Sequence, residues 1–287
     1  MTTNKSVMLQ GGLGNQLFQL AWAKYAESVL DQSVTCDSKV LLAKSIHGGI
    51  RLSDLIDFDH LQFSRRCIFF EQSYLAKAAR LISRKMGLRK LGGYLLYDFD
   101  AETKFSDALE AVNCRFHFGY FQYVQSALFV RNQLRSLIFD KNAHLIAKGQ
   151  KLYSHSVGVH VRRGDFLLST DPRHKVMDES YYLAAIRHFK DREFVIFTDD
   201  KAWCEKVFDG QNFKICGLLS ADVKPAIADF LSLVCCKDYI IGNSTFAWWA
   251  AFLSFTSKPV VYMPRLNISF LLEESNQLIG WDYIMGD

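Results

Sequence analysis

The sequence predicts an α/β protein with two domains. Its 287 residues suit two domains, because a domain averages roughly 150 residues. Near the N-terminus, the apolar run Val7-Met8-Leu9 enters a glycine turn and is followed by apolar residues at helical spacing. After residue 150, short apolar strands alternate with helices, which is typical of a mostly parallel, doubly wound sheet. We therefore expect domains at residues 1–150 and 151–287.

Composition places the chain among globular proteins and excludes several classes. The sequence is 49% hydrophobic and 22% charged, and its net charge of +4 is too mild for a nucleic-acid-binding surface. The sequence contains no run of about 18 apolar residues, which a membrane span would need. The start of the chain lacks the apolar core of a signal peptide. Seven cysteines without a CxxC pair indicate a reduced protein, which we expect in the cytoplasm.

The first element is expected to run as strand, glycine loop, helix and strand over residues 6–35. Its loop, Gly11-Gly12-Leu13-Gly14, allows the backbone to approach a ligand closely. The loop departs from the dinucleotide pattern GxGxxG, because Leu17 occupies the third glycine position. Asn15 and Gln16, which follow the glycines, offer amide donors and acceptors.

Residues 74–86 predict an amphipathic helix whose apolar stripe lies opposite a cationic face. The cations continue past this helix, and no acidic residue occurs between Gln72 and Tyr97. They are Lys77, Arg80, Arg84, Lys85, Arg89 and Lys90. One interpretation is a solvated helix face, with the apolar stripe packed on the core. The other is weak peripheral contact of residues 77–90 with the anionic headgroups of a membrane.

The second domain is expected to alternate strands and helices. The strands are expected at 157–161, 194–197, 239–241 and 260–262, and the helices at 181–189, 226–234 and 246–255. Ligands of doubly wound sheets bind at the carboxyl ends of the strands. The residues that follow each strand are therefore the first candidates for a functional site.

Two arginines follow the expected strand at 157–161. His160 lies within this strand and Arg162 comes two positions later, so both side chains should point to the same side. Arg162 and Arg163 would make a phosphate site, because a guanidinium can bind two phosphate oxygens at once. The alternative is a surface ion pair with Asp165. The position at the carboxyl end of a strand favours a binding role.

A second candidate site follows the expected strand at 239–241, where Gly242-Asn243-Ser244-Thr245 leads into a helix. Asn243 or Ser244 would cap that helix, and its first N–H groups would attract an anion. The alternative is an ordinary cap on a helix that buries Trp248-Trp249. Two anion sites at neighbouring strand ends together suit a diphosphate.

The sequence predicts no metal site. Asp57-Phe58-Asp59 and Asp98-Phe99-Asp100 resemble DxD sites, but chance produces such patterns at this frequency. The patterns HExxH, GxSxG and GxxxxGK[ST] are absent from the sequence. Zinc hydrolases, α/β-hydrolases and P-loop ATPases therefore lose their main support. Asp199-Asp200 end a strand and have either a functional or a capping role.

Three motifs occur in a fixed order along the chain. They are GGLGNQLFQ at residues 11–19, HVRRGD at 160–165 and NSTFAWW at 243–249. Shorter runs at 119–122, GYFQ, and 179–182, ESYY, lie between them. In this order the five runs resemble the bacterial α-1,2-fucosyltransferases of glycosyltransferase family 11, over residues 7 to about 255.

That resemblance implies a GT-B architecture, in which two Rossmann-like domains face one another across a cleft. The N-terminal half would hold the acceptor, and the C-terminal half would hold GDP-fucose. The reaction would be an inverting transfer of L-fucose to the 2-hydroxyl of a terminal galactoside in a glycan, in O-antigen or surface polysaccharide synthesis. No metal or other cofactor would be required, so side chains and helix N–H groups would have to meet the diphosphate charge.

The resemblance also implies roles for individual residues. His160 would contact guanine, and Arg162 would hold the diphosphate together with Ser244 and Thr245. Asp229, which stands 16 residues before Thr245, would accept hydrogen bonds from guanine N1–H and N2–H. Adenine cannot satisfy a carboxylate in this way, so Asp229 would set the base specificity.

Two residues are expected to act in catalysis. Arg162 would stabilise the charge on the leaving GDP. Asp165 would either take the proton of the galactose 2-hydroxyl or hold the arginines in place. Asn15, from the N-terminal half, would orient the donor or the acceptor. Two other functions stay open: a fucosyltransferase of different linkage, and a non-catalytic protein that binds a nucleotide sugar or glycan.

Overall fold

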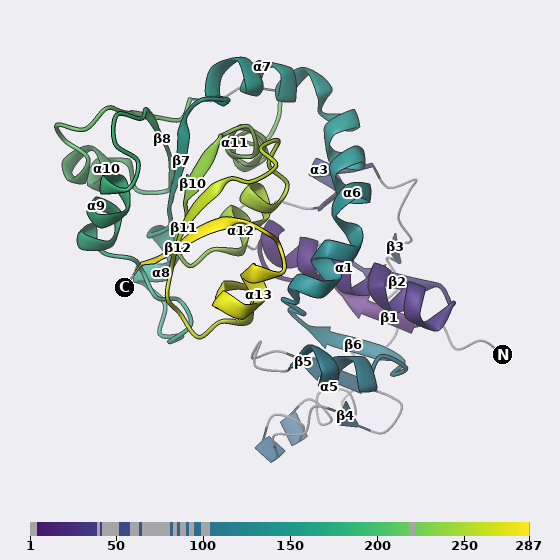
Figure 1. The fold of residues 1–287 in the computed structure, drawn as a ribbon. Coiled ribbons are helices and arrows are strands. Elements are labelled where there is room, and N and C mark those ends of the chain that lie inside the picture. The colour runs from purple at the N-terminus through teal and green to yellow at the C-terminus, as the bar shows by residue number, and fades with distance from the viewer. Residues whose placement is uncertain are drawn as a thin grey trace. The chain divides into compact units, whose positions relative to one another are not determined.

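The structure is a computed structural model with two compact units, Met1–Leu137 and Ile138–Asp287 (Figure 1). It describes residues 5–38, 41, 52–57, 63–64, 81–82, 85–86, 90–91, 95–98, 104–217 and 222–286. The division lies before the boundary expected at residue 150. The reason is that helix α7 (Ala143–Tyr153) packs on helix α11 (Pro225–Val234) and so belongs to the second unit.

The first unit is built on a six-stranded sheet in the order β3-β2-β1-β6-β5-β4, in which only the β4–β5 pair is antiparallel. The strands are β1 (Lys5–Met8), β2 (Val34–Asp37), β3 (Phe63–Ser64), β4 (Lys90–Leu91), β5 (Leu95–Asp98) and β6 (Phe116–Gly119). Its described helices are α1 (Leu13–Leu30), α3 (Leu52–Leu55), α5 (Phe105–Glu110) and α6 (Val124–Lys141), of which α6 continues into the second unit. The chain leaves β1 toward one edge and returns to β6 from the other, so the sheet has a switch point between these two strands.

The second unit has a six-stranded, fully parallel sheet in the order β12-β11-β10-β7-β8-β9. The strands are β7 (Val157–Val161), β8 (Phe194–Thr198), β9 (Phe213–Ile215), β10 (Asp238–Ile240), β11 (Val260–Pro264) and β12 (Asp282–Gly286). The helices besides α7 and α11 are α8 (Gly164–Leu167), α9 (Glu179–Arg187), α10 (Lys201–Val207), α12 (Thr245–Phe252), α13 (Glu273–Gln277) and the 3₁₀ turn η3 (Ser269–Leu271). Counted from β7, the strand order is 3-2-1-4-5-6, which is that of a Rossmann fold, with the switch point between β7 and β10. The predicted pair of Rossmann-like α/β units is confirmed.

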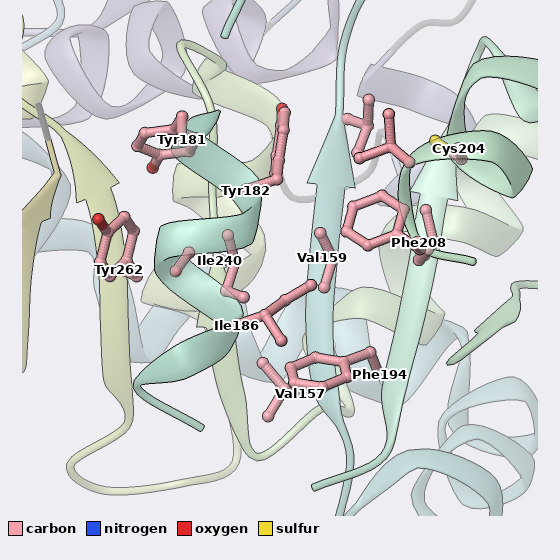
Figure 2. Close-up of a cluster of buried hydrophobic side chains, with 14 of the residues drawn as sticks. Val157, Val159, Tyr181, Tyr182, Ile186, Phe194, Cys204, Phe208, Ile240 and Tyr262 are labelled. Atoms are coloured by element: carbon pink, nitrogen blue, oxygen red, sulfur yellow. The ribbon is translucent and has the colours of Figure 1, made fainter. Parts of the chain in front are cut away.

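One face of this second sheet buries an apolar cluster under α9 and α10 (Figure 2). Val157 and Val159 of β7 point into this cluster, where they meet Ile186 of α9 and Phe208, the residue that follows α10. Because side chains alternate along a strand, Gly158 and His160 point to the opposite face. That opposite face is covered by α7, α11 and α12, and it carries the candidate site.

Helix α11 packs closely on β7, and Gly158 makes this approach possible. A Cβ atom at Gly158 would lie 2.5 Å from Leu233 Cδ1 and 3.0 Å from Cys236 Sγ. No real Cβ tolerates the shorter of these contacts, so a larger residue would push α11 away from the strand.

Most of the predicted cationic helix lies outside the described residues. That holds for Lys77, Arg80, Arg84 and Arg89. Ile82 and Met86 belong to the expected apolar stripe of this helix; both are described and exposed, so the interpretation that the stripe packs on the core is not met at these two residues. None of the helices in the described part of the chain has both the length and the hydropathy of a membrane span.

We predict that Gly158→Ala lowers the free energy of unfolding by about 1–3 kcal/mol, because the added methyl group overpacks the contact with α11. Urea denaturation of the full chain measures this change. Gly217→Ala is the control, since an added Cβ there has open space within 4 Å, and it should shift stability by no more than about 0.5 kcal/mol. Equal losses in the two variants would contradict the close packing at Gly158.

Candidate active site

The two candidate anion sites lie at the switch point of the second sheet. Strands β7 and β10 are hydrogen-bonded neighbours, with Ile240 opposite Val159. The segments that leave their carboxyl ends, residues 162–165 and 242–245, therefore start next to each other. The sequence predicted this arrangement, because parallel neighbours end at the same edge of a sheet.

Asp199, which follows β8, holds the segment after β7. Its Oδ1 accepts hydrogen bonds from the backbone N–H groups of Arg163 (2.9 Å) and Gly164 (3.1 Å). Its Oδ2 pairs with Arg162 Nη1 at 3.0 Å. A Cβ at Gly164 would lie 2.9 Å from that same Oδ2, so the approach of the carboxylate depends on the glycine. From the sequence, Asp199 was identified only as the end of a strand. Its contact with the segment after β7 arises because β8 is the parallel neighbour of β7.

Arg162 lies between two carboxylates. Its Nη2 pairs with Asp165 Oδ1 at 2.7 Å, in addition to the bond from Nη1 to Asp199. The guanidinium also packs over the Phe166 ring, 5.8 Å from its centroid. One third of the side chain is exposed, so a ligand can reach it. This contact is the surface ion pair that was the alternative for this segment. Asp165 does not hold both arginines as expected, because Arg163 pairs with Asp200 instead.

Arg163 does not share this site. Its Nε donates to Asp200 Oδ2 at 3.0 Å, and its guanidinium stacks 4.2 Å from the centroid of the Trp203 ring. The expectation that both guanidiniums bind one phosphate is therefore not met. Consecutive side chains point in opposite directions along an extended segment, which separates the two.

His160 is buried on the face of β7 that lies toward α11 and α12. Its ring packs 5.5 Å from the Phe246 ring, and burial together with the charge of Arg162 lowers the pKa of His160 to about 4. The imidazole is thus neutral at neutral pH. Its Nδ1 atom is buried and finds no hydrogen-bond partner among the described residues. An unpaired buried nitrogen is costly, so a ligand group that bonds to it would gain affinity.

Ser244 is the N-cap of α12, because its Oγ accepts from the N–H of Ala247 at 3.4 Å. Thr245 begins the helix, and Asn243 donates through Nδ2 to the carbonyl of Arg173. The capping interpretation is therefore realised, with Trp248 fully buried behind it. It does not conflict with anion binding, since the cap satisfies one N–H group, that of Ala247, and a helix N-terminus presents several.

Asp229 lies on α11, on the same side of the sheet as His160. The two helices of this face meet where Phe230 packs 5.2 Å from Phe246, the ring that covers His160. Partial burial raises the pKa of Asp229 to about 6, and Lys201 opposes the rise. The Asp229 carboxylate makes no hydrogen bond or ion pair within the described ranges. A carboxylate that is half-buried and lacks a partner is a candidate for ligand binding.

In the first unit, Asn15 lies at the switch point between β1 and β6. Gln122 Nε2 donates to Asn15 Oδ1 at 3.0 Å. Gly11 has φ +76°, which favours glycine, and a Cβ there would lie 2.9 Å from Asn15 Nδ2 and so displace the Asn15 amide. Asn15 is partly exposed and can still reach a ligand.

Two buried glutamines hold the loops around Asn15. Gln16 donates to the Gly11 carbonyl (3.0 Å) and accepts from the Leu52 N–H (2.9 Å). Gln19 accepts from the Gln10 N–H (2.9 Å) and donates to the Gly119 carbonyl (2.8 Å). The prediction that Gln16 offers its amide to a ligand is wrong, because both glutamines are fully buried and bonded to backbone.

No cluster of three or more histidine, cysteine, aspartate or glutamate side chains that could hold a metal ion occurs within the described ranges. Phe58-Asp59 and Phe99-Asp100, which complete the two DxD patterns, lie outside these ranges. The charged groups around β7 are instead arranged as arginine–carboxylate pairs.

Sequence comparison places these residues in a known context. The family model described as glycosyl transferase family 11 matches residues 5–285. An alpha-1,2-colitosyltransferase from Escherichia coli is 30% identical over 85% of this chain and 86% of its own. The O-antigen biosynthesis glycosyltransferase WbnK from E. coli is 28% identical over 90% of this chain and 92% of its own. A galactoside alpha-(1,2)-fucosyltransferase 1 from Sus scrofa is 36% identical over 44% of this chain and 39% of its own. The chain belongs to glycosyltransferase family 11.

Proposed function

We propose that this glycosyltransferase moves L-fucose from GDP-fucose to the 2-hydroxyl of a terminal galactoside, with inversion and without a metal. The observation that carries the proposal is Arg162, held by Asp199 at the carboxyl end of β7 beside the N-terminus of α12. Relatives named for α-1,2 transfer and for O-antigen synthesis support the linkage and a role in surface polysaccharide. Cytoplasmic location and contact of residues 77–90 with lipid stay predictions.

The donor diphosphate would lie between Arg162 and the first turn of α12. As the bond from the sugar C1 to the phosphate oxygen breaks, negative charge grows on the β-phosphate. Arg162 and the N–H groups that follow Ser244 would stabilise this charge more than that of the intact donor. Such stabilisation accelerates departure of GDP and needs no metal ion.

Donor binding would also change the state of Asp165. In the free protein this carboxylate is 2.7 Å from Arg162 Nη2, the nitrogen that would donate to a phosphate oxygen of the donor. A diphosphate that replaces Asp165 frees a carboxylate next to the reacting sugar. The freed group would accept the proton of the attacking galactose hydroxyl. In this scheme Asp165 pairs with Arg162 before donor binding and accepts the proton after it.

The base would be read from the α11 side of the sheet. Asp229 would accept from guanine N1–H and N2–H, and His160 Nδ1 would gain the partner that it lacks among the described residues. Asn15 of the first unit would orient the sugar or the acceptor.

The donor sugar has one specific alternative. Because a relative that aligns with most of this chain is named a colitosyltransferase, colitose, which is L-fucose without its 3-hydroxyl, is the second candidate. The test supplies GDP-fucose or GDP-colitose with acceptors that end in β-galactose or Galβ1-3GalNAc. Methylation analysis of the product identifies the linkage. Faster transfer from GDP-colitose would show that colitose, not fucose, is the donor sugar. A product with another linkage would overturn the α-1,2 assignment. GDP binding without any GDP release from the donor would show that the protein is non-catalytic.

We predict that Arg162→Ala and Arg162→Lys each reduce transfer more than tenfold. Loss of a charge-assisted contact that the bound diphosphate shields from solvent costs about 2–5 kcal/mol, and lysine does not replace the guanidinium fork. GDP release with a galactoside acceptor measures the effect. Arg187→Ala, at the far end of α9, is the matched control and should keep full activity. Activity above about a tenth of wild type in either Arg162 variant would refute the assignment.

We predict full activity in excess EDTA, because the proposed diphosphate site is made of Arg162 and helix N–H groups. The measurement is the initial rate of GDP release after dialysis against chelator. Inhibition that Mn²⁺ or Mg²⁺ reverses would show that a metal ion takes part.

We predict that Asp229→Asn stabilises the protein but weakens GDP binding. The pKa of Asp229 is raised from about 4 to about 6, so its charge opposes folding above pH 6, and this cost disappears as the pH falls through 6 toward 4. The variant should gain about 1–2 kcal/mol in urea denaturation at pH 8, after discounting for partial exposure. Calorimetry should show at least tenfold weaker GDP binding, and wild-type binding should weaken below pH 6. Glu205→Gln, which removes an exposed carboxylate, is the control; no stability gain at pH 8 would contradict the burial argument.

A further inference from the structure

We propose that Cys216 and Tyr153 line the base subsite of the nucleotide, so that bound GDP shields the Cys216 thiol from alkylation. This inference rests on the proposed function, because it assumes that the donor is a guanine nucleotide. It adds two residues that neither the motifs nor the candidate site contains.

Strand register places Cys216 in one row with His160. His160 pairs with Phe197 across β7 and β8, and Ile196 pairs with Ile215 across β8 and β9. The ladder continues by one residue, since Cys216 N–H donates to the Ile196 carbonyl at 2.8 Å. Phe197 and Cys216 therefore lie at the same level and point to the same face as His160. Two strand spacings separate His160 from Cys216, which is about 10 Å.

Three elements converge on the Cys216 end of this row. Tyr153 of α7 places its hydroxyl 3.7 Å from Cys216 Sγ, and its ring packs 6.5 Å from that of Phe197. Burial raises the pKa of both Cys216 and Tyr153, and the charge of Asp229 on α11 adds to both rises, with the Cys216 and Cys236 thiols contributing more than Asp229 to that of Tyr153. Thiol and phenol thus stay neutral. Lys214 of β9 lies 5.5 Å from the centroid of the Tyr153 ring and is paired with Glu193, so Asp229 is the carboxylate at this end of the row that is left to accept from a ligand.

The opposite end of the row supplies independent evidence for a ligand. His160 is more than nine-tenths buried, and its Nδ1 has no partner among the described residues. An acceptor at one end and an unsatisfied imidazole nitrogen at the other fit a planar heterocycle with N–H donors along one edge. The diphosphate of the same ligand would reach Arg162, two residues beyond His160.

Cys216 is also the thiol that a reagent can reach. It is partly exposed, whereas the other free cysteines in the described part of the chain are buried. With iodoacetamide, the thiol loses its proton to solvent, and the thiolate displaces iodide to form a thioether. Because burial raises the pKa of Cys216, the reaction should be slow at pH 7 and faster at pH 8.5.

The experiment follows alkylation of Cys216 by peptide mass spectrometry at pH 8.5, with no nucleotide, with GDP and with ADP. Saturating GDP should slow the reaction at least fivefold, and ADP at the same concentration should slow it less than twofold. Lys206→Cys places a thiol at an exposed position of α10, and GDP should leave its rate unchanged. In Asp229→Ala, protection should require at least tenfold more GDP.

Calorimetry on the same samples separates the two proposals. If GDP binds but Cys216 reacts at an unchanged rate, the thiol does not line the base subsite and this inference is wrong. If GDP does not bind at all, the proposed donor is wrong. Equal protection of Cys216 and of the cysteine at position 206 would indicate a general effect of GDP and would also overturn the inference.

Discussion

The candidate site depends on the hydrogen bonds and the ion pair that the Asp199 carboxylate makes. One oxygen accepts from two successive backbone N–H groups, which fixes the turn after β7, and the other oxygen orients Arg162. A partly exposed arginine would otherwise sample many rotamers, and ordering it would reduce the affinity for any ligand. Because Asp199 follows β8, the pairing of β7 with β8 is part of the site as well as of the fold.

In the first unit, neutral side chains hold the loops next to the candidate residue Asn15. Gln16 and Gln19 of α1 bond to backbone on both sides of the β1–β6 switch point, and all four of these bonds are sheltered from solvent to some degree. Asn15, one position before Gln16, is thereby carried at a fixed place on the helix. In both units, a side chain on a neighbouring element holds a loop in which glycine permits close approach, but the glutamines of the first unit are buried and Asp199 of the second is exposed.

The sequence predicted the two α/β units and the two loops that follow neighbouring strands of the second sheet, because hydrophobic period and glycine position are local properties. It did not reveal that Arg163 turns toward Asp200 and Trp203, since the partner comes from another strand. The buried position of Gln16 was not predicted for the same reason. An amide beside a glycine loop gives the same local sequence pattern whether its side chain contacts solvent or backbone. Cys216 and Tyr153 meet only through strand register and helix packing, and no local pattern marks them.

The ion pair between Arg162 and Asp165 has a consequence for turnover. A half-exposed pair of this kind contributes no more than about 1 kcal/mol, so a diphosphate with several contacts can displace it. After transfer, Asp165 first releases to solvent the proton that it took from the galactose hydroxyl. The restored carboxylate then competes for the guanidinium with GDP, which has lost the contacts of its sugar. A competitor tethered three residues away acts at high effective concentration. The aspartate would thus hasten departure of the spent nucleotide and limit inhibition by product.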